Sequence, residues 1–344
     1  MFKKLLVVLL AIALVGCSSG SKDTQETPSA STDANPEVNL TFSITAVNGD
    51  AHHEAMKKFK EEVEAAGVNI TVDTYDNGSL FKQDQELGAV QQGGKNGGAD
   101  IVYLSASWLT DVSPWVSMFA TGYMFKSYDH MTKVLNGEVG EEVFNRISEE
   151  QGILPLKAFY LGTRQISLGK DKEIKTPEDL NGVNLRMPNS ESWIYLGKAL
   201  GANPTPIAFS ELYTALQSGA VDGQDNPLPT VNSAKFYEVQ KSITLTNHLV
   251  DSVWPVINND TWNSLTEDQK TAVNNAMEAA RKTCDETNLA REAELVEFFK
   301  SEGLSVYEAD VDAFAKHVLD IYLNDEAQSG TWDMDLYEKV QSAY

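Results

Sequence analysis

Short apolar runs alternate along the chain with longer stretches in which apolar residues return every three or four positions. The short runs are rich in β-branched and aromatic residues and predict buried strands; they cover residues 40–45, 69–75, 101–104, 153–160 and 250–257. The stretches with helical spacing lie between them and cover residues 52–66, 83–92, 138–150 and 211–217. This alternation predicts an α/β fold in which helices cover mostly parallel sheets.

One predicted helix is much longer than the others. Ser264 and Glu267 have the spacing of a capping box, and Gly303 is a residue type at which helices often end. A helix from this box to about residue 300 would be roughly 50 Å long, which exceeds the diameter of one domain. We therefore expect it to run across two lobes. Two helices broken near residues 287–288 are the alternative.

The amino-terminal residues have a different composition from the rest of the chain. A basic start is followed by an apolar run over residues 5–15 and by Leu-Val-Gly-Cys at residues 14–17, which matches a bacterial lipoprotein signal. The apolar run is shorter than the about 20 residues that a transmembrane helix needs. The sequence predicts that residues 1–16 are removed and that Cys17 is diacylated, which anchors an extracytoplasmic protein to a bacterial membrane, at the cell surface or in the periplasm.

The residues after Cys17 predict a tether. Residues 17–37 consist mainly of small and polar residues without apolar periodicity, so they cannot bury enough surface to fold. A flexible coil of this length reaches about 25 Å. The folded body would therefore stay near a membrane partner.

The chain is strongly acidic, with 50 acidic and 27 basic residues and a formal net charge of −23. Removal of Lys3 and Lys4 with the signal peptide makes it −25. This charge repels nucleic acid and anionic lipid, so we expect no nucleic-acid partner and a membrane contact through the lipid alone. It also repels an anionic ligand at long range, so a site for an acid would depend on local arginines.

Little in the sequence suggests catalysis. The adjacent His52 and His53 point apart on a helix, and neither a nucleophile elbow nor a metal-binding histidine pair is visible. The glycine-rich residues 93–98 lack the Lys-Ser/Thr ending of a phosphate loop. Cys284 lies on an apolar helical stripe, which favours a packed thiol. We therefore expect a binding protein and no enzyme, with no cofactor and no metal.

Four blocks of sequence carry a family resemblance. They are Leu-Gly-Thr-Arg-Gln at residues 161–165, the segment 179–188, the segment 203–227, and residues 235–241 with 246–248. In order and spacing they resemble the solute-binding proteins of tripartite ATP-independent periplasmic (TRAP) transporters, the DctP family, of the type that binds sialic acid or sugar acids.

The resemblance implies a fold of the periplasmic-binding-protein kind. Two α/β lobes would be joined by crossing strands and a long lobe-spanning helix, and would close on the ligand like a hinged clamp. We expect residues 38–161 with 252–291 in the first lobe and residues 162–251 with 292–344 in the second.

Arg186 is the principal candidate for ligand binding. Pro188 forces Met187 into an extended conformation, which places Arg186 near the end of a strand, where ligands of open α/β sheets bind. A guanidinium there can donate two parallel hydrogen bonds to a carboxylate. The resemblance implies that Arg186 clamps the substrate carboxylate; a surface salt bridge is the alternative.

Three further residues of the second lobe follow from the resemblance. It implies that Asn226 hydrogen-bonds the same carboxylate, that Arg164 lies near the substrate, and that Phe209 packs on the body of the ligand. A loop position before Pro227 would explain Asn226 by turn chemistry alone. Core packing is the alternative for Phe209.

The first lobe departs from the sialic-acid binders. Asp84 aligns with an acidic residue that they direct at the sugar, although a carboxylate at a helix amino terminus is also favoured by the helix dipole. Ser105 and Trp108 stand where those proteins carry a glutamate and an arginine. Ser105 could donate to a hydroxyl and Trp108 could stack on a ring, or both could be loop and core residues. The departure favours a smaller sugar acid, such as a hexuronate or an aldonate.

The sequence therefore predicts a monomeric solute-binding lipoprotein that captures a carboxylate-bearing organic acid and delivers it to the membrane subunits of a TRAP permease. The acid would be a sugar acid: a hexuronate, an aldonate or sialic acid. A C4-dicarboxylate or a keto acid is the alternative within the same transporter class. A receptor that presents its ligand to a membrane sensor kinase is the alternative of a different class.

Overall fold

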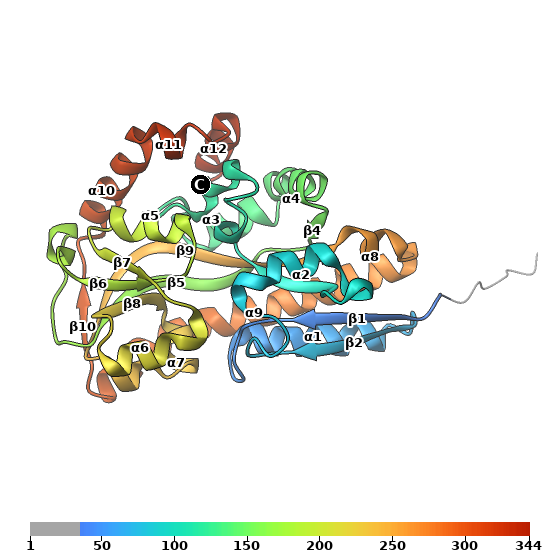
Figure 1. The fold of residues 1–344 in the computed structure, drawn as a ribbon, viewed down its shortest axis with the longest axis horizontal. Coiled ribbons are helices and arrows are strands. Elements are labelled where there is room, and N and C mark those ends of the chain that lie inside the picture. The colour runs from blue at the N-terminus through green and yellow to red at the C-terminus, as the bar shows by residue number, and fades with distance from the viewer. Residues whose placement is uncertain (1–34) are drawn as a thin grey trace, which may run out of the picture. The chain divides into compact units, whose positions relative to one another are not determined.

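The structure is a computed structural model that describes residues 35–344. Its core is one continuous set of hydrogen-bonded strands. The strands follow the order β2-β1-β3-β9-β5-β8-β6-β7, and β4 and β10 also pair with β9 (Figure 1). Their bounds are β1 Val38–Ser43, β2 Ile70–Tyr75, β3 Ile101–Leu104, β4 Ile153–Pro155, β5 Phe159–Leu168, β6 Asn184–Met187, β7 Asn203–Pro206, β8 Gly223–Pro227, β9 Ser242–Asn258 and β10 Ser305–Glu308. The strands expected at residues 40–45, 69–75 and 101–104 are present within two residues of their predicted bounds. The strand expected at 153–160 is instead β4 followed by the start of β5, and the strand expected at 250–257 is the second half of the longer β9.

The strands form two halves, which we call the first and the second lobe. In the first lobe, β1 pairs with β2 and β3 in parallel, and the end of β9 pairs antiparallel with β3 and β4. In the second lobe, β6 pairs with β7 and β8 in parallel. The 17-residue strand β9 belongs to both lobes, and it pairs antiparallel with β5. The expectation of mostly parallel sheets was therefore wrong for the crossing strands, since β9 runs antiparallel to β3, β4 and β5 and parallel to β10.

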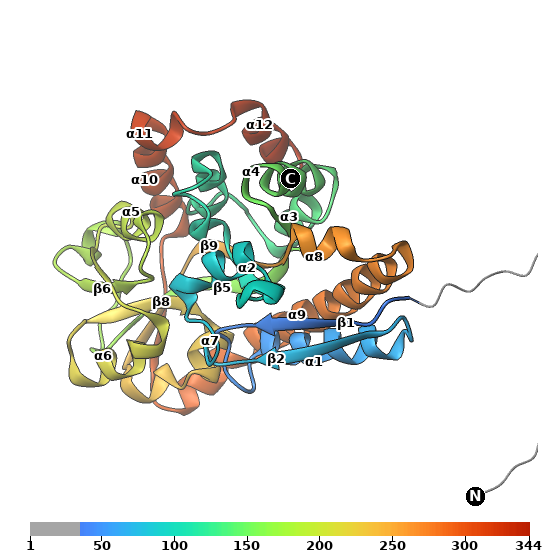
Figure 2. The same ribbon diagram turned by 45° about the vertical axis from the view of Figure 1, so that its right-hand side comes forward.

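Helices cover both faces of the strands (Figure 2). Their bounds are α1 Ala51–Ala65, α2 Glu86–Gln92, α3 Tyr128–Leu135, α4 Glu138–Gln151, α5 Glu191–Ala199, α6 Leu212–Ser218, α7 Leu228–Ser233, α8 Asn259–Ser264, α9 Glu267–Ser301, α10 Val311–Asn324, α11 Glu326–Ser329 and α12 Met334–Ser342. The four shorter helices that the sequence predicts are α1, α2, α4 and α6, with residues 83–85 forming a 3₁₀ turn before α2.

The long helix α9 is continuous over 35 residues, so the alternative of two broken helices was wrong. Its first part buries Val273 and Met277 in a core shared with β1 and α1, whereas Leu295 and Phe299 enter a separate core under α6 and α7. The helix therefore spans both lobes, as predicted.

The amino-terminal cap of α9 differs from the prediction by two residues. Thr266 accepts a hydrogen bond from the Gln269 amide, and the Gln269 side chain accepts from the Thr266 amide. Ser264 instead ends α8 and donates to the Thr261 carbonyl. The sequence over these residues contains two overlapping capping boxes, and the position of α8 decides between them.

Several expectations concern the ends of the chain. The signal peptide, Cys17 and nearly all of the predicted tether lie outside the described residues. Within residues 35–344 no helix combines the length and the apolar composition that a membrane span requires. The residue bounds of the two lobes remain a prediction. At the carboxyl end of the chain, α12 packs on α4, and Lys339 Nζ lies 2.6 Å from Glu142 Oε2.

Candidate ligand-binding site

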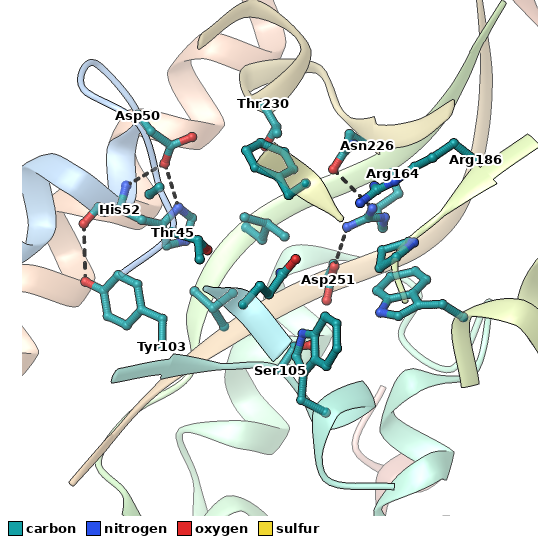
Figure 3. A pocket seen from close by; sticks show the side chains of 18 residues that line it. Thr45, Asp50, His52, Tyr103, Ser105, Arg164, Arg186, Asn226, Thr230 and Asp251 are labelled. Carbon is teal, nitrogen blue, oxygen red and sulfur yellow. Dashed lines mark hydrogen bonds and ion pairs between the residues drawn. The ribbon is translucent and has the colours of Figure 1, made fainter. Parts of the chain in front are cut away.

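A cavity of about 100 Å³ is lined by residues of both lobes and of the crossing strands. Figure 3 shows Arg164, Arg186 and Asn226 on one side of it and Asp50, His52 and Tyr103 on the other. A wider recess of about 490 Å³ adjoins this cavity, and the two share Thr45, Gln83, Trp108 and Phe209 in their linings. The predicted site residues therefore converge on one region.

Arg186 is a buried cation without a counter-ion. It lies on β6, 1% exposed, and both its Nε and Nη2 donate to the Ile207 carbonyl, at 2.9 and 2.6 Å. No carboxylate of residues 35–344 lies within ion-pair distance of it. Burial lowers the pKa of Arg186 to about 9, with Asp225 opposing and Arg164 adding to the effect, so the group is still charged at neutral pH. An anionic group in the cavity would compensate this charge.

Arg164 is in a different electrostatic situation. Its Nε lies 2.7 Å from Asp225 Oδ2 and its Nη1 lies 2.9 Å from Asp251 Oδ2, so two buried carboxylates surround one guanidinium. Burial lowers the pKa of Arg164, but the two carboxylates outweigh it and raise the pKa overall. Arg164 lines the cavity, but its charge is already compensated within the protein.

Asn226 is held by the same network. Its Oδ1 accepts from Arg164 Nη2 at 3.1 Å, and its Nδ2 donates to Gln224 Oε1 at 2.5 Å. The expected loop position was wrong, because Asn226 belongs to β8 and pairs with Gln165 of β5. The strand fixes the side chain in the lining of the cavity.

Two aromatic residues stand at the junction of the cavity and the outer recess. Phe209 is half-buried, lines both spaces and packs edge-on against Phe236, with ring centroids 5.7 Å apart. Trp108 is also half-buried and lines both spaces. Each presents an apolar surface to whatever occupies the junction, and each also packs against a core.

The two polar candidates of the first lobe lie at different depths. Ser105 follows β3, is 8% exposed, lines the inner cavity and shares a 2.6 Å hydrogen bond with Ser107 Oγ. Asp84 is exposed and lines only the outer recess. Asp84 is therefore positioned to meet only the part of a ligand that extends beyond the junction.

Sequence reasoning missed three parts of the lining. Asp251 comes from β9, Trp193 from α5, and the pair of Asp50 and His52 from the start of α1. The Trp193 ring packs under Arg164, with 4.4 Å between the ring centroid and Cζ, and its buried Nε1 has no acceptor among residues 35–344. An unsatisfied buried donor next to the two arginines suits an anionic ligand. The one signal in the sequence that could have identified Trp193 is its position five residues after the Arg-Met-Pro motif.

The comparisons with known proteins agree with this geometry. The sequence matches the family described as bacterial extracellular solute-binding protein, family 7, over residues 42–328, and the chain belongs to that family. One relative is the sialic acid-binding periplasmic protein SiaP of Vibrio cholerae, 31% identical over 305 residues that cover 88% of this chain and 93% of the relative.

Solved structures of relatives have the same fold. A TRAP periplasmic solute-binding protein from Roseobacter denitrificans, with bound 3-deoxy-D-manno-oct-2-ulosonic acid (KDO), is 39% identical, with a TM-score of 0.85 over 90% of this chain and 100% of that chain. A second protein from the same organism, with bound L-galactonate, is 32% identical, with a TM-score of 0.79 over 90% of this chain and 99% of that chain. The two-lobed α/β binding-protein fold expected from the sequence is therefore confirmed, and these relatives are binding proteins of a transport system.

Proposed function

We propose that this protein captures a sugar acid outside the cytoplasm and delivers it to the membrane subunits of a TRAP permease. The observation that carries the proposal is the buried Arg186, which faces a cavity and has no carboxylate partner among the described residues. A ligand carboxylate would provide the missing counter-charge. In a site from which water is excluded, this attraction is much stronger than it is at the surface.

The other candidate residues take supporting roles in this proposal. Asn226 donates to the same carboxylate, and Arg164 holds Asn226 in position. Phe209 and Trp108 enclose the body of the ligand at the junction, where apolar faces suit the C–H surface of a sugar. Ser105 binds a hydroxyl in the inner cavity, and Asp84 meets a long ligand at its outer end.

A hydroxylated acid is favoured over a simple dicarboxylate. The related structures named above hold KDO and L-galactonate, and both ligands combine one carboxylate with several hydroxyls. The cavity offers one uncompensated cation and several polar groups that are suited to hydroxyls. A second carboxylate would meet the negative field of Asp50, Asp251 and the rest of the acidic chain.

Anchoring and assembly complete the proposal. In this proposal, Cys17 is diacylated and anchors the protein to a bacterial membrane, and the residues up to 37 tether the body to it. The protein acts as a monomer, and the closed form is the one that the permease recognises. Family membership supports the extracytoplasmic location, and the sequence motif supports the lipid anchor.

Calorimetry and thermal unfolding of the purified full chain with a panel of acids test the proposal. The panel contains KDO, L-galactonate, D-glucuronate, sialic acid and succinate. A ligand present at 100 times its Kd should stabilise the fold by about 2.7 kcal/mol. We expect such a shift with at least one sugar acid and its loss in Arg186→Ala. Arg146→Ala, which removes a partly exposed arginine of α4 that does not line the cavity, should leave the shift unchanged. If no acid stabilises the protein, or if Arg186→Ala binds normally, the proposal is wrong.

A further inference from the structure

His52 lines the cavity and carries a ring nitrogen that has no partner among residues 35–344. The residue is 2% exposed and lies in the first turn of α1, opposite Arg186 across the cavity (Figure 3). Its Nδ1 lies 2.9 Å from Asp50 Oδ1, but its buried Nε2 has no hydrogen-bond partner in the part of the chain that the structure describes. Buried polar atoms are rarely left unpaired, so this nitrogen lacks a partner that the site should supply.

Asp50 fixes the orientation of the imidazole. As the amino-terminal cap of α1, its carboxylate also accepts from the His52 amide at 2.8 Å. Burial raises the pKa of Asp50, but the bonds to His52 outweigh it and lower the pKa overall, so the group is ionised at neutral pH. An ionised carboxylate requires a proton on Nδ1, so Nε2 is the nitrogen that remains available.

Neighbouring groups hold the pair in place. Tyr103 Oη donates to the His52 carbonyl at 3.3 Å, and the two rings meet edge-on with centroids 5.8 Å apart. Ser233 of α7, in the second lobe, donates to Asp50 Oδ2 at 3.1 Å. The histidine is therefore held before any ligand arrives, at a position where the two lobes touch.

We propose that His52 is a specificity-determining residue whose Nε2 forms a hydrogen bond with a hydroxyl of the bound acid, and that Asp50 is its positioning residue. This inference rests on the proposed function and names the ligand class more closely. A hydroxyl can donate to a neutral imidazole and accept from a protonated one, so it fits either charge state of His52. An acid without a hydroxyl at this point would leave Nε2 buried and unpaired, which sites of this kind reject strongly.

The test compares two substitutions of His52, each of which keeps a polar group near only one of the two ring nitrogens. The amide of His52→Asn reaches roughly the position of Nδ1 and retains the bond to Asp50, whereas the amide of His52→Gln reaches roughly the position of Nε2. His53→Asn is the matched control, because His53 is a buried neighbour on α1 that is paired with Asp76 and does not line the cavity. Calorimetry of the full chains measures the Kd for KDO, L-galactonate and succinate, and circular dichroism verifies that each variant is folded.

For the hydroxylated acid that the wild type binds, we expect His52→Asn to weaken binding by about 10- to 100-fold, the range for an unpaired buried group. His52→Gln should weaken it less, and His53→Asn by less than about twofold. Succinate, which leaves Nε2 unpaired in the wild type, should bind no more weakly to any of the three variants, and His52→Asn, which removes Nε2, should not repeat for succinate the loss seen with the hydroxylated acid. If a folded His52→Asn retains wild-type affinity while Arg186→Ala loses it, the inference about His52 is wrong and the proposed function stands. If the wild type binds none of the acids, both are wrong.

Discussion

Two buried arginines face the same cavity, and they differ in what compensates their charge. Arg164 is neutralised by carboxylates that lie 61 and 87 residues further along the chain, on β8 and β9. Among residues 35–344, Arg186 has only the Ile207 carbonyl as its partner. The sequence could identify both arginines, because each lies in a recognisable motif. It could not give the electrostatic reason for their different roles, because the compensating carboxylates meet Arg164 only through the pairing of strands.

This difference predicts that removing the charge of Arg164 lowers the free energy of unfolding much more than removing the charge of Arg186. Arg164→Met should destabilise the ligand-free protein by about 3–5 kcal/mol, because it leaves Asp225 and Asp251 buried without a partner. Arg186→Met should cause a much smaller change, because the loss of two bonds to Ile207 is offset by the removal of an uncompensated charge. Urea unfolding without ligand measures both. Equal losses in the two variants would contradict the difference in roles.

Glu86 provides a second prediction at the scale of one residue. It is 1% exposed at the start of α2, its Oε1 has no partner among residues 35–344, and burial raises its pKa well above the ordinary value of 4.5. Below pH 4.5 the folded and unfolded chains both hold the proton. Above it only the unfolded chain releases the proton freely, so stability falls as the pH rises toward the folded pKa.

Glu86→Gln should therefore raise the melting temperature at pH 7, and the gain should disappear near pH 4. Thermal unfolding at several pH values tests this expectation, with Glu294→Gln on an exposed position of α9 as the control. A gain of the same size at both pH values would show that packing, and not ionisation, causes the effect.

At the scale of elements, α9 replaces hydrogen bonds that β5 loses at a bulge. The register with β9 shifts between Tyr160 and Gly162. Asp285 accepts from the Tyr160 amide at 2.7 Å, Asn288 donates to the Tyr160 carbonyl at 2.7 Å, and Glu292 accepts from the Thr163 amide at 2.6 Å. These spacings of three and four residues place the three side chains on one face of the helix. The sequence predicted the helix and the strand, but not this junction, because polar residues inside a long helix usually face solvent.

The bulge makes Gly162 sensitive to substitution. Its φ is +128°, and a Cβ there would lie 2.5 Å from Pro227 Cβ. Gly182 also has a positive φ, of +78°, but a Cβ there would meet nothing within 4 Å. Gly162→Ala should therefore cost clearly more than the about 1 kcal/mol expected from backbone strain alone in Gly182→Ala. Urea unfolding of the two variants gives the comparison, and equal costs would contradict the close contact with Pro227.

The agreement between sequence and structure is closest for the elements. Apolar periodicity locates strands and helices because burial produces it directly. Local turn and capping signals were less reliable: they failed at Asn226, where pairing with β5 overrode the turn preference of Asn-Pro, and at the cap of α9. The first-lobe lining was the least predictable, since Asp50, His52 and Thr45 lie in or beside the loop between β1 and α1. The contact of Asp50 with Ser233 of α7 joins residues that are 183 positions apart in the sequence.

At the scale of the whole molecule, the net charge of −23 opposes the arrival of an anionic ligand. Salt screens this repulsion, with a Debye length that falls from about 30 Å at 0.01 M to about 8 Å at 0.15 M. We expect the association rate constant of a bound sugar acid to rise by about twofold or more over this range. Stopped-flow tryptophan fluorescence measures it. A rate that falls with salt would mean that Arg186 and Arg164 control the encounter.

The lipid anchor gives a separate prediction. Cys17→Ala should prevent acylation, so the protein should move from the detergent phase to the aqueous phase in a detergent partition of cell extracts. Mass spectrometry of the mature amino terminus provides the direct check. If the wild-type protein carries no acyl chains, the predicted anchor is wrong.

The two ends of the cavity are built in different ways. Arg164 and Asn226 belong to strands and to one buried network with Asp225 and Asp251, so a change at one of them disturbs the others. Arg186 is fixed on the neighbouring strand β6. Thr45 and Ser105 instead follow the ends of β1 and β3 in connecting segments, where a substitution disturbs little else. Over evolutionary time such a molecule can exchange one cargo for another by altering loops, while it retains an inherited grip on the feature that all its cargoes share.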